Sequence, residues 1–172
     1  DVYLKEEIQE EALARNLTGF HRFLEIAALT NGEIVNYANI ASECGVSAQT
    51  IKSYFGILED TLVGYMIPAY TKVMKRRLVQ APRFFFFDVG LTNHLLHRDA
   101  LLRGTPEYGH AFEHFIIMEL IAYIGYNHKE EQLSYWRTHT GVEVDVVIGN
   151  AKLAIEIKSA DEIAKRHMKG LK

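Results

Sequence analysis

Cysteine is almost absent: Cys44 is the single one among 172 residues, which excludes an internal disulfide framework. This scarcity is typical of a reducing compartment, so we expect a cytoplasmic protein. No apolar run reaches the roughly 20 residues that a membrane-spanning helix needs, and the charged N-terminus is unlike a signal peptide. The chain also lacks an initiator methionine, and we expect it to be a fragment of a longer protein.

Excess positive charge is missing too. The formal net charge is -3, which excludes a general electrostatic attraction to nucleic acid, so any such contact requires a local patch. The best patch is a basic cluster made of Lys72, Lys75, Arg76 and Arg77, with a solvated loop as the equally open alternative. Hydrophobic residues make up 48% of the chain and charged ones 24%, a balance that predicts a folded core rather than disorder.

A helix-turn-helix is predicted between residues 36 and 62. A short helix runs to Cys44, Gly45 permits a sharp turn, and Ser47 is placed to cap the next helix. Apolar residues then recur at steps of three and four, which gives the second helix one continuous apolar face. They are Ile51, Tyr54, Phe55, Leu58 and Leu62. This arrangement is the helix-turn-helix layout.

Two apolar strands separated by a basic loop follow this motif. Residues 63–70 and 83–88 predict the strands, and residues 71–82 the loop that carries the basic cluster. Strand, basic loop and strand after a helix-turn-helix indicate a wing, so we expect residues 1–80 to form a helical, winged-helix domain. The run Phe84–Phe87 is interpreted as core, or else as a strand that pairs with an absent domain or another subunit.

The second helix of the motif is the element that would read DNA. Gln49 and Lys52 lie near its start and are chemically able to contact bases or phosphates, so they join the basic cluster as candidate nucleic-acid-binding residues. The helix ends in the acidic pair Glu59-Asp60, however, and winged helices also serve as dimerisation or docking modules. A packing or protein-contact role, a homo-oligomer included, therefore stays open.

The second half, residues 81–172, predicts a small α/β domain with a mixed sheet, which makes the whole chain an α+β fold. A turn-rich break over residues 104–109 precedes a helix expected from His110 to Ile124. Three strands are then expected, over residues 134–137, 142–148 and 153–158. The boundary between the halves is placed near residue 80.

Two histidines, His110 and His114, stand four residues apart on the expected helix, a spacing that can hold a metal. No Glu occupies the second place of a His-Glu-x-x-His pattern, and no third ligand is evident. We interpret both as helix-terminal histidines. No Gly-x-Ser-x-Gly elbow for acyl transfer is present in the sequence either.

The last two expected strands carry the most informative pattern. Side chains alternate between the two faces of a strand, so one face of this hairpin is aliphatic. That face holds Val142, Val144, Val146, Ile148, Leu153, Ile155 and Ile157. The opposite face holds three carboxylates and one ammonium group: Glu143, Asp145, Glu156 and Lys158.

The expected register brings these charged groups together. If residues 149–152 form the turn, Ile148 faces Leu153, Asp145 faces Glu156 and Glu143 faces Lys158. Opposed carboxylates repel, and a divalent cation with a preference for oxygen ligands, such as Mg²⁺, removes that penalty. The alternative is a solvated charged face on an edge hairpin. The apolar residues that flank Glu156 and Lys158 favour a central strand instead.

Asp145 followed by Glu156-Ile-Lys158 resembles the PD-(D/E)XK motif of restriction-endonuclease-like nucleases, with Val144 in the place of the proline. The resemblance implies that Asp145 and Glu156 bind Mg²⁺ and that Lys158 orients the attacking water. In that superfamily a Glu on a preceding helix often completes the metal site, and Glu113 matches that position. These four residues are the candidate catalytic set, and the three acidic ones are the candidate metal ligands.

A wider resemblance covers nearly the whole chain. The helix-turn-helix, the strand that ends in Phe87-Asp-Val-Gly-Leu, the Gly109–Glu113 element, Tyr135-Trp-Arg and Ile155-Glu-Ile-Lys occur in the order typical of one protein family. Together they resemble the C-terminal region of a family of prokaryotic AAA-type ATPases. The resemblance implies an N-terminal ATPase domain as a partner in the same parent chain. No phosphate-loop motif occurs here, so ATP would bind only in that absent domain.

The leading hypothesis is therefore a Mg²⁺-dependent nuclease site that is placed on DNA by a winged helix and coupled to an ATPase. The competing hypothesis is a non-catalytic module that binds DNA or protein and regulates or oligomerises the ATPase. A transcription regulator, which would depend on Gln49 and Lys52, is the third.

Overall fold

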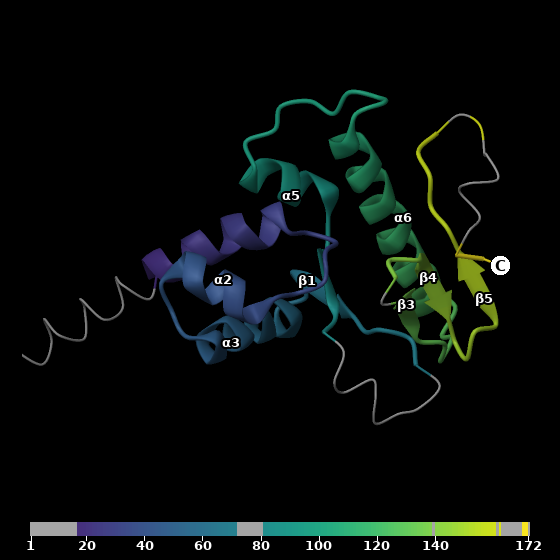
Figure 1. Cartoon of the computed structure of the whole chain (residues 1–172), viewed down its shortest axis with the longest axis horizontal. Coiled ribbons are helices and arrows are strands. Elements are labelled where there is room, and N and C mark those ends of the chain that lie inside the picture. The colour runs from purple at the N-terminus through teal and green to yellow at the C-terminus, as the bar shows by residue number, and fades with distance from the viewer. Residues whose placement is uncertain (1–16, 72–80, 139, 161, 163–169, 172) are drawn as a thin grey trace, which may run out of the picture.

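The computed structural model describes residues 17–71, 81–138, 140–160, 162 and 170–171. Its elements are a helix over residues 17–29, α2 (Tyr37–Cys44), α3 (Ala48–Asp60), β1 (Gly64–Ile67), β2 (Arg83–Phe86), α5 (Val89–Leu95), α6 (Pro106–Tyr126), β3 (Leu133–Arg137), β4 (Glu143–Ile148) and β5 (Leu153–Ile155). The predicted α+β fold is confirmed. Figure 1 shows α2 and α3 at one end of the molecule, β3–β5 at the other, and β1 and α6 between them.

The helix-turn-helix forms as predicted, because both the predicted turn and the predicted helix cap form. Gly45 takes the left-handed conformation, with φ 68°, at the end of α2. The Ser47 hydroxyl then accepts a hydrogen bond of 3.0 Å from the Thr50 N–H and caps α3. The predicted apolar face of α3 is buried at Ile51, Tyr54, Phe55 and Leu58, whereas Leu62 is exposed.

The two strands of the wing pair antiparallel, from Gly64 opposite Phe86 to Ile67 opposite Arg83. Both strands are shorter than predicted. Residues 72–80, which include Lys72, Lys75, Arg76 and Arg77, lie outside the described residues, so the basic loop of the wing stays a prediction.

The second sheet has the order β3-β4-β5, and its strands pair antiparallel. Ile148 lies opposite Leu153, the predicted register. The expectation that the last strand is central was wrong for the part of the chain that the structure describes: β5 is at the edge, and Leu153 is exposed. The mixed sheet expected for this half was wrong for the described strands, because every strand pair in the two sheets is antiparallel. Ala69 forms an isolated parallel bridge with Tyr135, which links the segment after β1 to β3.

Strand β2 contributes to both hydrophobic cores. Phe84 and Phe86 point into the core formed by the helix over 17–29, α2 and α3, where the Phe84 ring packs at a tilt of 60° against Phe55 with ring centroids 4.8 Å apart. Phe85 points the opposite way and packs in the second core with Ile117 of α6 and Val146 of β4. The alternation of a strand places Arg83 on the same face as Phe85. Because one strand serves both cores, we expect the two halves to fold as one unit; a domain boundary near residue 80 stays a prediction.

Helix α6 begins at Pro106, one turn earlier than predicted, and Thr105 caps it by accepting a hydrogen bond from the Tyr108 N–H. The segment interpreted as a turn-rich break is therefore a helix start. His114 consequently lies inside the helix and is 1% exposed, so its interpretation as a helix-terminal residue was wrong. Within the described residues, no helix is both long and apolar enough to cross a membrane.

A ring of hydrogen bonds fixes α6 against β2 at His114, more than two turns into the helix. The Phe86 N–H donates to Asn31 Oδ1 at 2.8 Å, which orients the Asn31 amide so that its Nδ2 donates to His114 Nδ1 at 3.3 Å. His114 Nε2 lies 2.6 Å from the Phe86 carbonyl oxygen and must therefore carry the proton. The neutral ring thus donates from Nε2 to the Phe86 carbonyl oxygen and accepts at Nδ1 from the Asn31 amide. Burial lowers the pKa of His114 below its usual value.

Replacement of Phe85 by alanine should destabilise both halves together. We expect Phe85→Ala to lower the free energy of unfolding by about 3–5 kcal/mol, the usual cost for a buried phenylalanine. Phe87→Ala is the matched control: its side chain is 50% exposed, and we expect a loss below about 1 kcal/mol. Urea unfolding followed by far-UV circular dichroism and by the fluorescence of Trp136, on β3, measures both. Separate transitions from the two probes would contradict a single folding unit.

Acidification should weaken the fold through His114. Its folded pKa lies below its usual 6.5, so above that pH both states carry a neutral ring and the full stability is present. As the pH falls below 6.5, His114 binds a proton in the unfolded chain but stays neutral in the folded chain, so the free energy of unfolding declines. We expect His114→Gln to show a smaller decline in the free energy of unfolding between about pH 7 and pH 5 than the wild type. The exposed His94→Gln should leave the decline unchanged, and equal slopes for all three proteins would refute the assignment.

Candidate functional site

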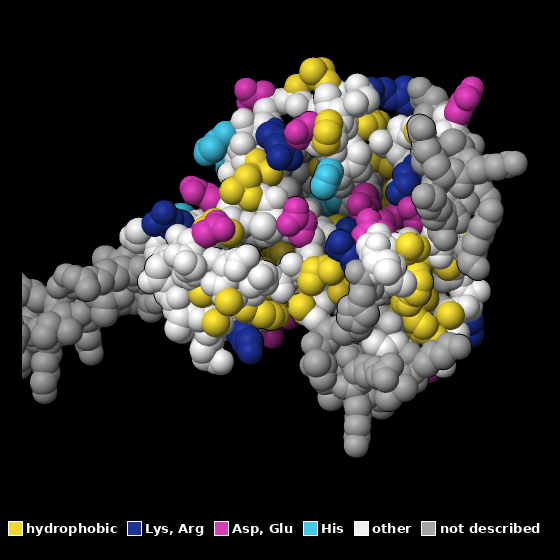
Figure 2. Space-filling model, viewed as in Figure 1, with side chains coloured by type: hydrophobic (Ala, Val, Ile, Leu, Met, Phe, Trp, Pro, Cys, Tyr) yellow, Lys and Arg dark blue, Asp and Glu magenta, His cyan; other side chains and the backbone are white. Residues whose placement is uncertain are grey.

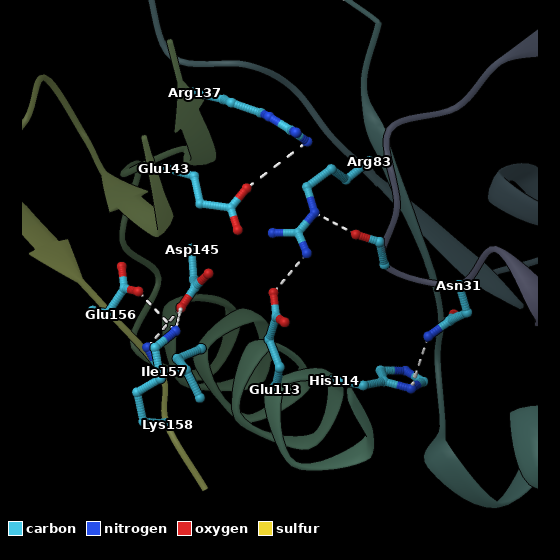
Figure 3. Close-up of polar contacts among 11 residues, drawn as sticks. Asn31, Arg83, Glu113, His114, Arg137, Glu143, Asp145, Glu156, Ile157 and Lys158 are labelled. Atoms are coloured by element: carbon cyan, nitrogen blue, oxygen red, sulfur yellow. Dashed lines mark hydrogen bonds and ion pairs between the residues drawn. The ribbon is translucent and has the colours of Figure 1, made fainter. Parts of the chain in front are cut away.

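Four sequence-predicted residues come from three elements that meet around one cleft (Figure 3). Asp145 lies on β4, Glu156 and Lys158 directly follow β5, and Glu113 lies on α6. Glu113, Asp145 and Lys158 line a cleft of about 460 Å³, whereas Glu156 lies beside it in contact with Lys158. Figure 2 shows acidic and basic side chains gathered in this region, in front of α6.

Asp145 is held by the backbone of the segment after β5. The ladder between β4 and β5 stops at Val146 and Ile155, one position before the expected Asp145–Glu156 pair. Asp145 Oδ2 instead accepts a hydrogen bond of 2.7 Å from the Ile157 N–H. The Asp145 side chain is only 6% exposed, so this bond fixes the carboxylate and leaves Oδ1 for another partner. The predicted direct opposition of the two carboxylates therefore does not form.

Lys158 binds both carboxylates of the hairpin. Its Nζ lies 2.7 Å from Glu156 Oε1 and 3.6 Å from Asp145 Oδ2. Desolvation lowers the pKa of Lys158, but the hydrogen bond to Glu156 and the charges of Asp145, Glu156 and Glu113 outweigh it and raise the pKa. Between the two carboxylates, Lys158 is thus held in its charged form, in which it can act as a cation or a proton donor.

Glu156 has one carboxylate oxygen without a partner. Oε1 accepts from Lys158, whereas Oε2 is buried and has no hydrogen-bond partner among the described residues. The side chain as a whole is 12% exposed. A buried carboxylate oxygen without a donor is costly, which makes Oε2 an open position for a cation or a water molecule.

Glu113 is aimed at the cleft by the period of α6. It stands one turn before Ile117, which is fully buried against the sheet, so both residues lie on the same face of the helix. Arg83 Nη2 donates to Glu113 Oε1 at 2.6 Å. Burial raises the pKa of Glu113, Arg83 opposes this, and the charge of Asp145 adds to the rise. Glu113 and Asp145 therefore repel each other, and Arg83 offsets part of that repulsion.

Two arginines of the cleft were not predicted from the sequence. Arg83 stands on β2, and Arg137, at the end of β3, lies 3.9 Å from Glu143 at its closest approach. Glu143 is half exposed and also lines the cleft. The β3–β4 register places Arg137 opposite Glu143, so cross-strand pairing was the signal that could have found Arg137. The sequence holds no comparable signal for Arg83, because its partner lies 30 residues away on a helix.

The charges and atoms of the cleft fit a divalent cation, but the present arrangement does not chelate one. Among the described residues, four carboxylates and three positively charged side chains line the cleft, and Glu156, which lies beside it, adds a fifth carboxylate. The carboxylates are Glu33, Glu113, Glu143 and Asp145, and the cations are Arg83, Arg137 and Lys158. The two negative charges in excess match the two positive charges of one Mg²⁺. Yet no three Asp, Glu, His or Cys side chains among the described residues are gathered closely enough to hold a metal.

The candidate DNA-binding residues lie on α3, an element that is distant in sequence from the candidate catalytic residues of the cleft. Gln49 and Lys52 are both exposed, and the Lys52 ammonium group lies 5.5 Å from the centre of the Tyr37 ring. The exposed end of the same helix carries Glu59 and Asp60. Their role in nucleic-acid binding stays a prediction, like that of the basic cluster outside the described residues.

Comparisons with known proteins divide the chain into two family segments. Residues 108–172 match a model described as Domain of unknown function (DUF4143), a domain that occurs in some AAA-ATPase-associated proteins. Neither the search of curated proteins nor that of solved structures found a match. Residues 1–102 match a model described as Domain of unknown function (DUF8612), and because this match covers more than half of the chain, the protein belongs to that family.

Proposed function

We propose that the cleft between α6 and the second sheet hydrolyses phosphodiester bonds of DNA with the help of Mg²⁺. The observation that carries this proposal is the contact of Lys158 with both Asp145 and Glu156 at one wall of the cleft. The unpartnered Glu156 Oε2 and the excess of carboxylates support a divalent cation as the missing component. The resemblance of these residues to the PD-(D/E)XK motif supports the nuclease chemistry.

The residues divide into oxygen ligands and cations. Asp145 Oδ1, Glu156 Oε2 and the Glu113 carboxylate are the oxygens that would hold Mg²⁺, which supplies charge neutralisation at phosphate and lowers the pKa of water. In the reaction, a water oxygen bonds to phosphorus and gives up a proton to solvent, while the bond from phosphorus to the leaving sugar oxygen breaks and that oxygen takes up a proton as a hydroxyl group. Protonated Lys158 lies beside both carboxylates, where it can orient the water and stabilise the negative charge that develops on the phosphate.

We further propose that this region works beside an ATPase domain of the same parent chain. The order of its motifs resembles the C-terminal region of prokaryotic AAA-type ATPases. The occurrence of the matched DUF4143 domain in some AAA-ATPase-associated proteins supports the same association. In this arrangement the helix-turn-helix and wing place DNA, the cleft acts on it, and the reducing cytoplasm suggested by the single cysteine is the compartment.

A non-catalytic interaction module is the second candidate, and one observation favours it. Each carboxylate that would bind metal already has a protein cation beside it: Arg83 for Glu113, and Lys158 for Asp145 and Glu156. A nuclease-like shell in which lysine and arginine balance the carboxylates permanently would need no metal. This candidate and the nuclease differ in whether Mg²⁺ or Mn²⁺ enters the cleft.

Incubation of the chain with single- and double-stranded DNA and Mg²⁺ or Mn²⁺ tests the catalytic proposal. We expect metal-dependent cleavage, and we expect Lys158→Ala and Asp145→Asn each to lower its rate by about a hundredfold or more, as is usual for groups that act on the reacting atoms. Product analysis on denaturing gels measures the rates.

Lys152→Ala is the matched control for Lys158→Ala. Lys152 stands on the same hairpin and pairs with Glu131 at 3.3 Å, outside the cleft, so its loss should leave the rate unchanged. The catalytic proposal fails if no DNA is cleaved, or if Lys158→Ala and Lys152→Ala cleave equally well.

A further inference from the structure

Arg83 is the side chain of the wing that contacts a candidate metal ligand of the cleft, Glu113. It opens β2, the strand that also forms the wing and the first core. The alternation that buries Phe84 and Phe86 on one face turns Arg83 to the other, toward α6. Its side chain is 16% exposed and lines the cleft, so a ligand in the cleft can reach the guanidinium group.

Three contacts orient the Arg83 guanidinium. Its Nε donates to the Gly32 carbonyl oxygen, so the position of the group does not depend on Glu113 alone. Its central carbon lies 5.2 Å from the centre of the Phe85 ring and 5.9 Å from that of Tyr135, within the range of cation–π attraction. Because these three contacts do not involve Glu113, they can hold the guanidinium group in place when Glu113, its fourth partner, is exchanged.

Arg137, the other arginine of the cleft, is held far more loosely. Its closest atom to Glu143 is 3.9 Å away, and the side chains are 49% and 55% exposed. An exposed pair at this distance contributes little, whereas the Arg83–Glu113 pair is short and mostly buried. The two arginines therefore offer a natural comparison, since they carry the same charge in one cleft but only Arg83 binds a candidate metal ligand.

We propose that Arg83 is a phosphate-binding gate, which holds Glu113 while the cleft is empty and passes from Glu113 to a DNA phosphate when the strand enters. A phosphodiester presents two anionic oxygens that match the fork of a guanidinium group at least as well as a carboxylate does. Glu113, released from Arg83, is then free to bind the metal. This inference rests on the proposed function, because it concerns how the same site is assembled.

The exchange makes DNA and metal binding cooperative. In the empty cleft a metal must compete with Arg83 for Glu113, while Asp145 and Glu156 are engaged with Lys158. A bound phosphate takes over Arg83, so the metal gains one carboxylate ligand when DNA is present. By thermodynamic reciprocity, the metal must strengthen DNA binding by the same factor. The site would thus be assembled only on its substrate.

Titration of Mn²⁺ into the chain, followed by electron paramagnetic resonance with and without a short single-stranded DNA, measures this coupling. For the wild type we expect DNA to tighten Mn²⁺ binding by roughly tenfold, within the usual range for coupled sites. In Arg83→Gln, Glu113 is already free, so Mn²⁺ should bind tightly without DNA and the effect of DNA should vanish. The wild-type measurement needs no variant, so an absence of tightening by DNA refutes the exchange even if Arg83→Gln does not fold.

Two further variants separate the exchange from a general effect of charge. Arg137→Gln removes the same charge from the same cleft, and we expect it to keep most of the tightening by DNA. In the double variant Arg83→Gln with Glu113→Gln, the gain in Mn²⁺ affinity should disappear, because that gain is attributed to the freed carboxylate.

The outcomes distinguish this inference from the proposed function. If Mn²⁺ binds in a way that Asp145→Asn abolishes, but DNA does not tighten it, the gate is refuted and the metal site stands. The gate is equally refuted, with the metal site intact, if Arg83→Gln and Arg137→Gln behave alike. If no Mn²⁺ binds above the level of Asp145→Asn, with or without DNA, the proposed function and the gate fall together.

Discussion

The ion pair between Arg83 and Glu113 is the contact on which the candidate site depends. It joins the strand that forms the wing to the helix that faces the second sheet, across 2.6 Å. Without it, Glu113 would stand beside Asp145 in a mostly buried cleft, and two like charges in low dielectric repel strongly. In the proposed mechanism, the same pair keeps the third carboxylate from a metal until a phosphate binds Arg83. One interaction would then both stabilise the resting cleft and set the condition for its assembly.

The scaffold around this pair packs against both halves of the chain. Phe84 and Phe86 commit one face of β2 to the first core, and Phe85 commits the other face to the second. The ring of hydrogen bonds from Phe86 through Asn31 to His114 fixes α6 one residue beyond Glu113. The bridge between Ala69 and Tyr135 adds a backbone link between the sheets. Short, specific contacts thus join the wing strand to the cleft.

Much of this arrangement was predictable because it is local. The period of a strand and a short turn fixed which side chains of the last hairpin share a face, and the Ile148–Leu153 register followed. Gly45 and Ser47 placed the helix-turn-helix for the same reason. The start of α6 was missed although Thr105-Pro106 carries a cap and a first-turn proline, because these residues also suit a turn.

What could not be predicted is long-range. The partner of Glu113 comes from a strand 30 residues earlier, and no spacing rule connects the two. The expected contact of Asp145 with Glu156 was replaced by the Ile157 N–H, since β5 ends before Glu156 and frees that donor. The edge position of β5 among the described strands was likewise hidden, because apolar flanks suggest burial from either a neighbouring strand or a helix. Here Ile157 and part of Ile155 are buried in the second core, to which α6 contributes Ile117, whereas Leu153 stays exposed.

The most direct test of a metal site in the cleft is to locate a bound metal on the chain. Nuclear magnetic resonance of the isotopically labelled protein, with Mn²⁺ added in small steps, broadens backbone amide signals near the ion before all others. We expect the strongest broadening around Asp145 and Ile157, with Glu113 joining them when DNA is present. Signals that stay sharp there, or that broaden first on another surface, would show that these carboxylates serve structure and not metal-dependent chemistry.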